Sequence, residues 1–182
     1  MVITVHDLEL RPLYFDQEFQ PGALDLGTDA IQRTALHTTG QADLVEEIEG
    51  QRRIPDIRLR GKLAASIELP CARCVEPVQY DVKSDFDLLY RPINADAHRD
   101  EAAISEAETE IGFYQGDGIQ LEDVIKEQVL LALPPKVLCR EDCKGLCPQC
   151  GKNLNQGSCR CETKLSDPRW AALESIKGKL QK

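Results

Sequence analysis

"IRLRGKLAASIELPCARCVEPVQYDVKSDFDL", residues 57–88, decides the fold because two stretches of alternating apolar and polar residues flank a C-x-x-C motif. Apolar residues occupy most odd positions from Ile57 to Leu69, and most even positions from Val78 to Leu88. This period of two is typical of strands with one buried face. We therefore predict an antiparallel hairpin, with strands at 57–70 and 75–88 and with Cys71 and Cys74 at its tip.

A four-residue loop over 71–74 would also set the register of this hairpin, because the numbers of paired residues must then sum to 145. In that register apolar residues oppose apolar residues and basic residues oppose acidic ones. The predicted pairs are Leu59 with Phe86, Leu63 with Val82, Ala65 with Tyr80, Ile67 with Val78, Arg58 with Asp87 and Arg60 with Asp85. We therefore interpret the basic stretch "RRIPDIRLRGK" (52–62) as cross-strand ion pairs on a solvated face, in preference to an RNA-binding patch.

The remaining sequence predicts an α+β fold. Short candidate strands occur in residues 1–50, around "VITV" and "TALHTTGQADLVEEI", whereas the acidic stretch 91–110 is expected to form a solvated loop. "IQLEDVIKEQVLLALPP" predicts a helix at about 120–133, and "SDPRWAALESIKGKLQK" predicts a C-terminal helix. We expect a β-rich body with one helix at 1–138, built on an antiparallel sheet that contains the hairpin. A cysteine-rich zinc-binding segment and the terminal helix follow at 139–182.

Composition limits the class of protein. The chain has 182 residues with 22 basic and 31 acidic side chains, a net charge of -9, which argues against nucleic-acid binding through the bulk field. It contains no run of 18 apolar residues and no signal-peptide pattern at its start, so a cytoplasmic protein without a membrane partner is expected. In a reducing compartment, eight cysteines are more typical of metal ligands or redox groups than of a structural disulfide framework.

The tract "CREDCKGLCPQCGKNLNQGSCRC" (139–161) holds six of the eight cysteines. Zinc binds four thiolates in a tetrahedron, and these often come from cysteine pairs separated by two residues. Four intact pairs can form two quartets in three ways. We favour a local site formed by the last two pairs, which leaves the first two to clamp the hairpin tip to the tract. Two structural zinc ions are predicted, with a single ion as the alternative. The predicted ligands are Cys71, Cys74, Cys139, Cys143, Cys147, Cys150, Cys159 and Cys161.

Other cysteine chemistries fit less well. A thioredoxin-like redox role for Cys71 and Cys74 would require the pair at the start of a helix, but the sequence predicts a hairpin there. Iron–sulfur ligation is not indicated, because the C-x3-C, C-x2-C and C-x-C spacings match neither ferredoxin pattern. No histidine lies in a motif, and there is no nucleotide-binding loop or hydrolase triad. We therefore expect a protein that binds rather than an enzyme.

The segments "LPCARCVEPV", "LEDVIKEQVLLALPPKVLC", "CKGLCPQCGKNLNQGSC" and "DPRWAAL" occur here in the order in which a known family has them. Together they resemble the YceD family, the large-ribosomal-RNA-subunit accumulation proteins of bacteria and plastids. The resemblance implies a role in the synthesis, processing or stability of 23S rRNA and thus in ribosome biogenesis.

Two function hypotheses follow. The first is a zinc-stabilised factor for large-subunit assembly; the second is a zinc-responsive or thiol-redox regulator whose cysteines change state. Because the protein is acidic, we expect it to reach large-subunit components or assembly factors mainly through protein contacts, with weak binding to naked RNA. The candidate partner-binding residues are Arg140, Lys144, Lys152, Arg160 and Trp170.

Overall fold

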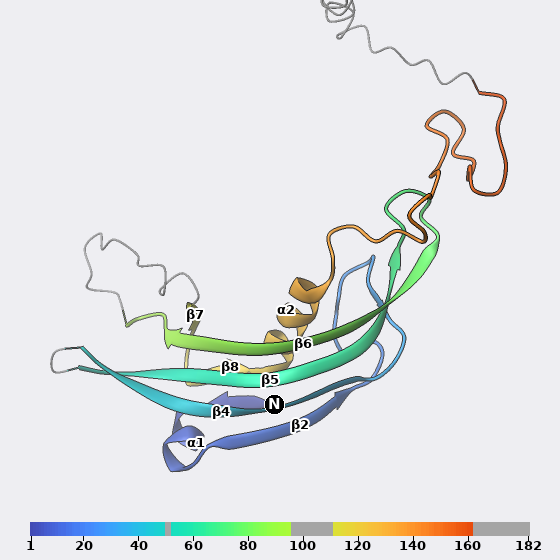
Figure 1. The fold of residues 1–182 in the computed structure, drawn as a ribbon. Helices are drawn as coiled ribbons and strands as arrows, with labels where there is room; N and C mark the ends of the chain where they lie inside the picture. Colours follow the sequence, from blue (N-terminus) through green and yellow to red (C-terminus); the bar gives the residue numbers. More distant parts are fainter. Residues whose placement is uncertain (50–51, 96–110, 162–182) are drawn as a thin grey trace, which may run out of the picture. The chain divides into compact units, whose positions relative to one another are not determined.

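The computed structural model describes residues 1–49, 52–95 and 111–161. The chain divides into two compact units: a body formed by Met1–Pro70 and Pro77–Val137, and a cysteine unit formed by Cys71–Glu76 and the chain from Leu138 onward. The elements, all in the body, are β1 (Val2–Thr4), α1 (Val5–Leu10), β2 (Leu13–Phe19), β3 (Ile31–Gln32), β4 (Leu36–Glu49), β5 (Arg52–Pro70), β6 (Pro77–Pro92), β7 (Ile111–Tyr114), β8 (Gly118–Gln120) and α2 (Leu121–Ala132) (Figure 1). The mixed α+β class is confirmed.

The body is built on a six-stranded sheet in the order β2-β4-β5-β6-β7, with β3 also paired to β5. A second, two-stranded sheet pairs β1 with β8. The predicted antiparallel sheet is largely confirmed, and the exception lies at one edge, where β7 runs parallel to β6. The short strand β7 pairs with the last four residues of β6, Leu89–Pro92.

The hairpin of β5 and β6 is confirmed, but its predicted register is wrong by two residues. Leu59 pairs with Leu88 and Ile67 pairs with Tyr80, so paired numbers sum to 147. The strands close with Pro70 opposite Pro77, which leaves a six-residue loop in place of the predicted four. A shift of two keeps every side chain on its predicted face, because the side-chain period of a strand is two.

The ion pairs on the solvated face do not all join directly opposed residues, because Asp87 lies opposite Arg60 in the observed register. The guanidinium of Arg58 donates to both carboxylate oxygens of Asp87, at 2.8 and 2.6 Å, so this predicted pair is confirmed. The predicted pair of Arg60 with Asp85 is wrong. Arg60 donates instead to Asp43 on β4, at 2.7 Å, and Lys62 lies 3.5 Å from Asp85. The structure thus shows these three basic side chains of the "RRIPDIRLRGK" stretch facing carboxylates.

The long strands curve (Figure 1). At three positions a glycine faces an aromatic ring across the sheet. A Cβ at any of these glycines would lie within 2.7 Å of a ring carbon of the facing residue. Glycine in a strand permits this close approach, and the ring replaces the missing side chain in covering the backbone. The pairs are Phe15 with Gly40, Phe86 with Gly61 and Tyr90 with Gly112.

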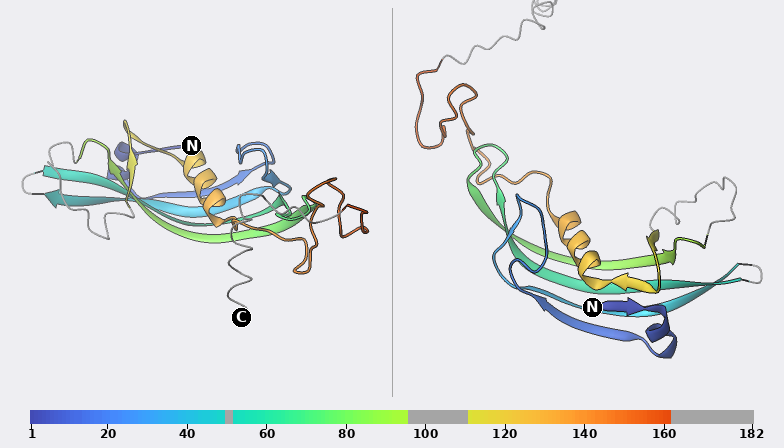
Figure 2. Two further views of the ribbon diagram at one scale, coloured as in Figure 1. Left: turned by 90° about the horizontal axis from the view of Figure 1, so that it is seen from above. Right: turned by 180° about the vertical axis from the view of Figure 1, so that it is seen from behind.

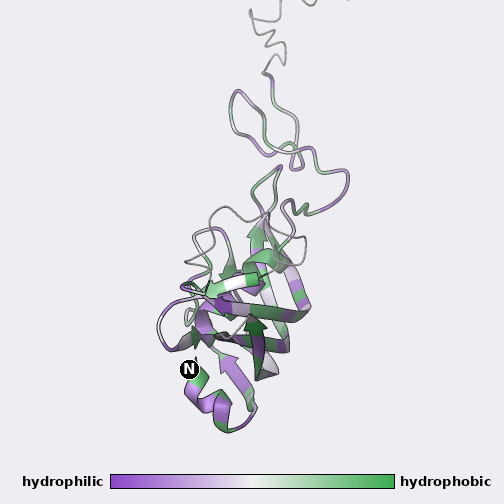
Figure 3. Cartoon of the chain, turned by 90° about the vertical axis from the view of Figure 1, so that its left-hand side faces the viewer, coloured by the Kyte–Doolittle hydropathy of each residue, from purple (hydrophilic) through white to green (hydrophobic). Residues whose placement is uncertain are grey.

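The core of the body lies between the sheet and helix α2, which rests against its concave face (Figure 2). Hydrophobic and hydrophilic residues alternate along the strands, as the period of two requires (Figure 3). The predicted helix is confirmed; it has acidic residues in its first turn and buries Leu121, Val124, Ile125 and Val129. The backbone N–H of Leu121 donates to the Met1 carbonyl oxygen at 3.0 Å, which ties the helix start to β1.

Two predictions for the body need correction. Residues 5–10 form helix α1, where only strands were expected; Thr4 caps it by accepting from the Asp7 N–H at 3.2 Å. Arg91 belongs to β6 rather than to a solvated loop; it is buried and donates to Asp56 at 2.8 Å. Of the other predicted loop residues, Pro92 ends β6 and 93–95 form a turn. Residues 96–110 and the predicted C-terminal helix with Trp170 lie outside the described residues. No helix in the described part of the chain combines the length and hydrophobicity that a bilayer crossing requires.

Candidate metal centre

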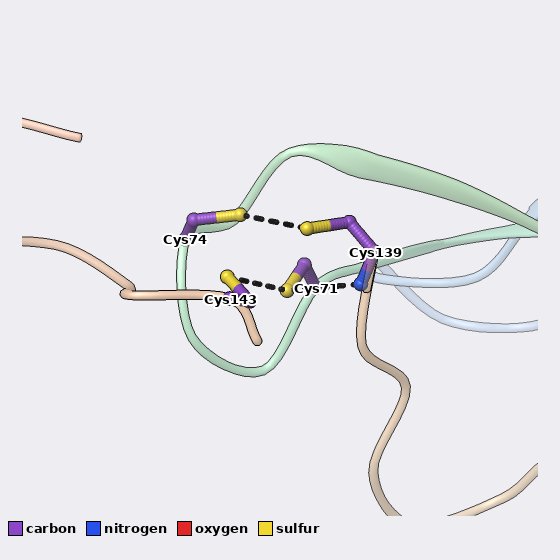
Figure 4. Close-up of side chains that lie close together, drawn as sticks. All are labelled: Cys71, Cys74, Cys139 and Cys143. Atoms are coloured by element: carbon purple, nitrogen blue, oxygen red, sulfur yellow. Dashed lines mark hydrogen bonds between the residues drawn. The ribbon is translucent and has the colours of Figure 1, made fainter. Parts of the chain in front are cut away.

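The eight cysteines form two groups of four within the cysteine unit. We name Cys71, Cys74, Cys139 and Cys143 the clamp quartet (Figure 4), and Cys147, Cys150, Cys159 and Cys161 the local quartet. Within each quartet the four Sγ atoms lie within 4.8 Å of one another. This is the grouping that the sequence favoured.

The sulfur separations in the clamp quartet fit a tetrahedral metal ion. Cys74 Sγ lies 3.6 Å from Cys139 Sγ, and Cys71 Sγ lies 3.9 Å from Cys143 Sγ. A tetrahedron with zinc–sulfur bonds of about 2.3 Å places its sulfurs about 3.8 Å apart, whereas a disulfide bond is only about 2.05 Å long. The donor set therefore suits a tetrahedral divalent cation such as zinc.

One cysteine pair of each quartet sits on the same backbone turn. In Cys71–Glu76 the N–H of Val75 donates to the Cys71 carbonyl at 2.9 Å, and the N–H of Cys71 donates to the Glu76 carbonyl at 2.8 Å. In 147–152 the N–H of Gly151 donates to the Cys147 carbonyl at 2.9 Å, and the N–H of Cys147 donates to the Lys152 carbonyl at 2.8 Å. The fifth residue is left-handed in both turns, with φ of 63° at Val75 and 71° at Gly151. Both motifs are therefore knuckles of one kind, which present two sulfurs to the same side.

Hydrogen bonds stabilise the deprotonated form of two thiols of the clamp quartet, Cys71 and Cys143. Burial raises the pKa of Cys71, but hydrogen bonds from the backbone N–H groups of Arg73, Cys139 and Cys74 outweigh it and lower that pKa to about 6. The side-chain amide of Asn155 donates to Cys143 Sγ at 3.2 Å and lowers the pKa of that thiol. Burial and the neighbouring sulfurs raise the pKa of Cys139 to about 12. Four clustered thiols therefore cannot all ionise unless a cation balances them.

The local quartet has the same electrostatic pattern. Backbone N–H groups of Cys150 and Gln149 lower the pKa of Cys147 to about 6. The hydrogen bond with Cys150 and burial raise the pKa of Cys161 to about 12. Each quartet thus contains a cysteine whose lowered pKa favours the thiolate at neutral pH, and a cysteine that would lose its proton only when a metal binds.

Cysteine supplies all four donors in each quartet, which is typical of a structural zinc site, because a catalytic site keeps one position open. The clamp quartet also joins distant segments, since Cys74 and Cys139 are 65 residues apart in the sequence. A metal there would close a long loop and reduce the entropy of the unfolded chain.

The structure gives two of the candidate partner-binding residues an internal role. Arg140 donates to the side-chain oxygen of Asn155 at 2.8 Å, and Lys152 donates to the Ser158 carbonyl at 2.9 Å. Lys144 and Arg160 are exposed, and Trp170 lies outside the described residues.

Sequence reasoning missed Asn155 and Arg73. Arg73 donates to the carbonyl of Cys143 at 2.8 Å and so joins the hairpin loop to the tract. Neither residue type nor spacing distinguishes these two residues in the sequence, because their partners are distant in the chain.

A family model described as "Large ribosomal RNA subunit accumulation protein YceD" matches residues 59–177, which include most of the β5–β6 hairpin and all eight cysteines. The chain belongs to the YceD family.

Relatives of this YceD chain occur in bacteria and plants. An uncharacterized protein of Mycobacterium tuberculosis is 36% identical over 163 residues, which cover 90% of this chain and 72% of that protein. YlbN of Bacillus subtilis is 25% identical over 177 residues, which cover 96% and 94% of the two chains. The chloroplastic large ribosomal RNA subunit accumulation protein YCED homolog 1 of Zea mays is 26% identical over 166 residues, which cover 77% and 56%. No solved structure matches the chain significantly.

Proposed function

We propose that this YceD family protein is a zinc-stabilised factor that supports the synthesis, processing or stability of 23S rRNA and the assembly of the large ribosomal subunit. One observation carries the proposal: the matched family region contains two complete cysteine quartets whose sulfurs are grouped as a tetrahedral metal requires. The described part of the chain contains two such groups and no third. The protein would act in the cytoplasm by binding, and the zinc would be structural.

Its charges support recruitment through proteins rather than through naked RNA. The described residues of the cysteine unit contain five basic and three acidic side chains, a net of +2. Two zinc ions with eight thiolates add -4, which leaves the loaded unit near -2. On the body, Arg58 and Arg60 face carboxylates at 2.6 and 2.7 Å. These pairs reduce the number of described cations that could neutralise phosphates, so we expect salt-dependent RNA affinity to be weak.

The metal content is tested by native mass spectrometry of protein purified under reducing conditions without added metal. We expect two zinc ions in the wild type, and one in each of Cys74→Ser and Cys150→Ser, since each variant breaks one quartet. Ser84→Ala in the body is the matched control and should retain both. Iron in place of zinc would contradict the proposal. A metal-free protein with Cys71 and Cys74 in a disulfide would instead favour the redox regulator.

The cellular role is tested by deleting the gene and measuring the ratio of 23S to 16S rRNA. We expect a fall in this ratio, which the wild-type gene restores and a Cys74→Ser, Cys150→Ser double variant does not. An unchanged ratio after deletion would contradict the role in rRNA accumulation.

The route to the subunit is tested by titrating purified 23S rRNA at about 150 mM salt, beside a pull-down from lysate with and without nuclease. We expect weak RNA binding and co-purification of large-subunit proteins that survives nuclease. Two results together would contradict this route. The first is tight RNA binding with a steep salt slope. The second is that charge reversal at Lys144 and Arg160 weakens this RNA binding, whereas charge reversal at Lys83 of the body does not.

A further inference from the structure

The side chain of Asn155 connects the two quartets. It lies in the loop 151–158, between Cys150 and Cys159 of the local quartet, yet its Nδ2 donates to Cys143 Sγ of the clamp quartet at 3.2 Å. Its Oδ1 accepts from the backbone N–H of Lys144 and from the guanidinium of Arg140, both at 2.8 Å. Because these two groups can only donate, the amide oxygen must face them and the amide nitrogen must face the sulfur.

The loop that carries Asn155 is itself braced against both segments of the clamp quartet. Leu154 N–H donates to the Gly145 carbonyl at 2.9 Å, next to the tract that bears Cys143. Asn153 Nδ2 donates to Glu76 in the hairpin loop at 3.1 Å, and Asn153 Oδ1 accepts from the Asn155 N–H at 2.9 Å. The position of Asn155 therefore depends on the conformation of the whole loop.

We propose that Asn155 is a positioning residue for the clamp quartet and that through it metal binding at the two quartets is positively coupled. Both ends of the loop are bonded to the residues that bear local-quartet sulfurs, so a metal bound there restrains the loop and lowers the entropy cost of placing Asn155. Coupling of this kind is reciprocal, so a metal in the clamp quartet also favours the local one. The inference rests on the proposed metal binding.

The chemistry of the contact gives its direction and size. An N–H group that faces a thiolate stabilises its negative charge and orients its lone pairs toward the metal position. Loss of such an outer hydrogen bond typically lowers metal affinity about 10- to 100-fold. The same range is expected for Asn155→Ala at the clamp quartet.

The test is a cobalt(II) titration of the full-length, reduced, metal-free chain, with zinc as competitor. Cobalt bound to four thiolates reports each site through its d–d and sulfur-to-metal charge-transfer bands. The double variant Cys159→Ser, Cys161→Ser leaves only the clamp quartet intact. When Asn155 is present, this double variant should lower the cobalt affinity of the clamp quartet. In an Asn155→Ala background the same two substitutions should lower that affinity little further. Such a difference is the signature of coupling in a double-mutant cycle.

Asn155→Asp separates positioning of the sulfur from support of the loop. Aspartate can still accept from Lys144 and Arg140, but it has no N–H to offer Cys143. We expect it to lower clamp affinity and shift the charge-transfer band as Asn155→Ala does. Ser158→Ala is the matched control, because the Ser158 hydroxyl has no hydrogen bond among the described residues; this variant should bind as the wild type does.

The outcomes separate this inference from the proposed function. Two bound ions with wild-type affinity and spectrum in both Asn155 variants would overturn the coupling and leave the metal sites intact. If Asn155→Asp alone keeps the wild-type cobalt affinity and spectrum, Asn155 only supports the loop, and its proposed role at the Cys143 sulfur is overturned. A wild-type chain that binds no cobalt would overturn the proposed metal binding, and this inference with it.

Discussion

Val75 occupies a backbone conformation that suits glycine better. Its φ of 63° lies in the left-handed region, where the Cβ of an L-residue crowds the following carbonyl at a cost of roughly 1–2 kcal/mol, and branching at Cβ makes the conformation rarer still. The equivalent position of the second knuckle is Gly151, with φ of 71°. The two backbone hydrogen bonds that close the hairpin knuckle hold the valine in place.

This difference predicts opposite effects of two exchanges. Val75→Gly should leave clamp-quartet metal affinity unchanged or raise it, because relief of strain offsets the entropy that glycine adds to the unfolded chain. Gly151→Val should lower local-quartet affinity roughly tenfold, which corresponds to about 1–2 kcal/mol of strain. Competition with a chromophoric chelator measures both affinities. Ala72→Gly, at an exposed position of the hairpin knuckle, controls for glycine alone; a tenfold loss in Val75→Gly would show that the valine side chain is needed.

At the scale of elements, the curved sheet depends on close approaches at its glycines. A Cβ at Gly61 would lie 2.6 Å from Phe86 Cζ and 2.6 Å from the Thr39 carbonyl oxygen. Phe86 is buried and the Thr39 oxygen belongs to the backbone of a paired strand, so neither can move away easily. The glycine is therefore required by packing across three strands.

Gly61→Val should destabilise the body by roughly 1–3 kcal/mol, as overpacking of a core does. Ala64→Val is the matched control, because Ala64 lies on the exposed side of the same strand and valine favours strands. Urea unfolding followed by far-UV circular dichroism compares the two. Equal stability of Gly61→Val and the wild type would show that the sheet relaxes around the new side chain.

The pair of Arg58 with Asp87 predicts how the stability of the body depends on pH. The hydrogen bond from Arg58 holds the pKa of Asp87 below its usual range. A depressed folded-state pKa stabilises the fold above the unfolded pKa, about 3.9 for aspartate, and this contribution is lost as the pH falls through the folded value.

Asp87→Asn should therefore lose less stability than the wild type when the pH is lowered from 5 to 3. Urea midpoints measured with a chelator present exclude the effect of acid-driven metal release. Asp81→Asn, at an exposed position of the same strand, should keep the wild-type pH dependence. An identical pH dependence of Asp87→Asn and the wild type would show that solvent screens the pair completely.

At the scale of the whole molecule, the two units are stabilised in different ways. The body has a contiguous apolar core drawn from its sheet, its helices and the 24–26 loop. In the described part of the cysteine unit, the buried apolar side chains are the cysteines Cys71, Cys74, Cys143 and Cys147, while Val75, Leu138 and Leu146 are exposed. The described residues of this unit are too few to fold on such a core, so we expect the proposed metals to supply most of their stability.

Removal of metal should therefore disorder the cysteine unit and leave the body folded. After chelation under reducing conditions we expect unchanged β-sheet circular dichroism, together with loss of amide hydrogen-exchange protection over 138–161. Added zinc should restore the protection. Unfolding of the sheet on chelation would show that the body depends on the metals as well.

Local patterns predicted a large part of this molecule. The period of two identified β5 and β6 and the buried face of each, because alternation along a strand depends only on the chain itself. The acidic first turn and apolar spacing identified α2 for the same reason. The spacing of the cysteine pairs indicated the grouping into two quartets, since a knuckle such as 147–152 is formed by adjacent residues.

Only the tertiary structure decided which distant residues meet. The register moved by two residues because the hydrogen bonds of the Cys71–Glu76 turn need six residues. Arg60 pairs with Asp43 because β4 lies beside β5, and Asn155 reaches Cys143 because a loop folds back over the tract. These contacts join residues far apart in the chain, so their free energy depends on the packing of the whole fold, whereas strand alternation and cysteine spacing are properties of the sequence alone.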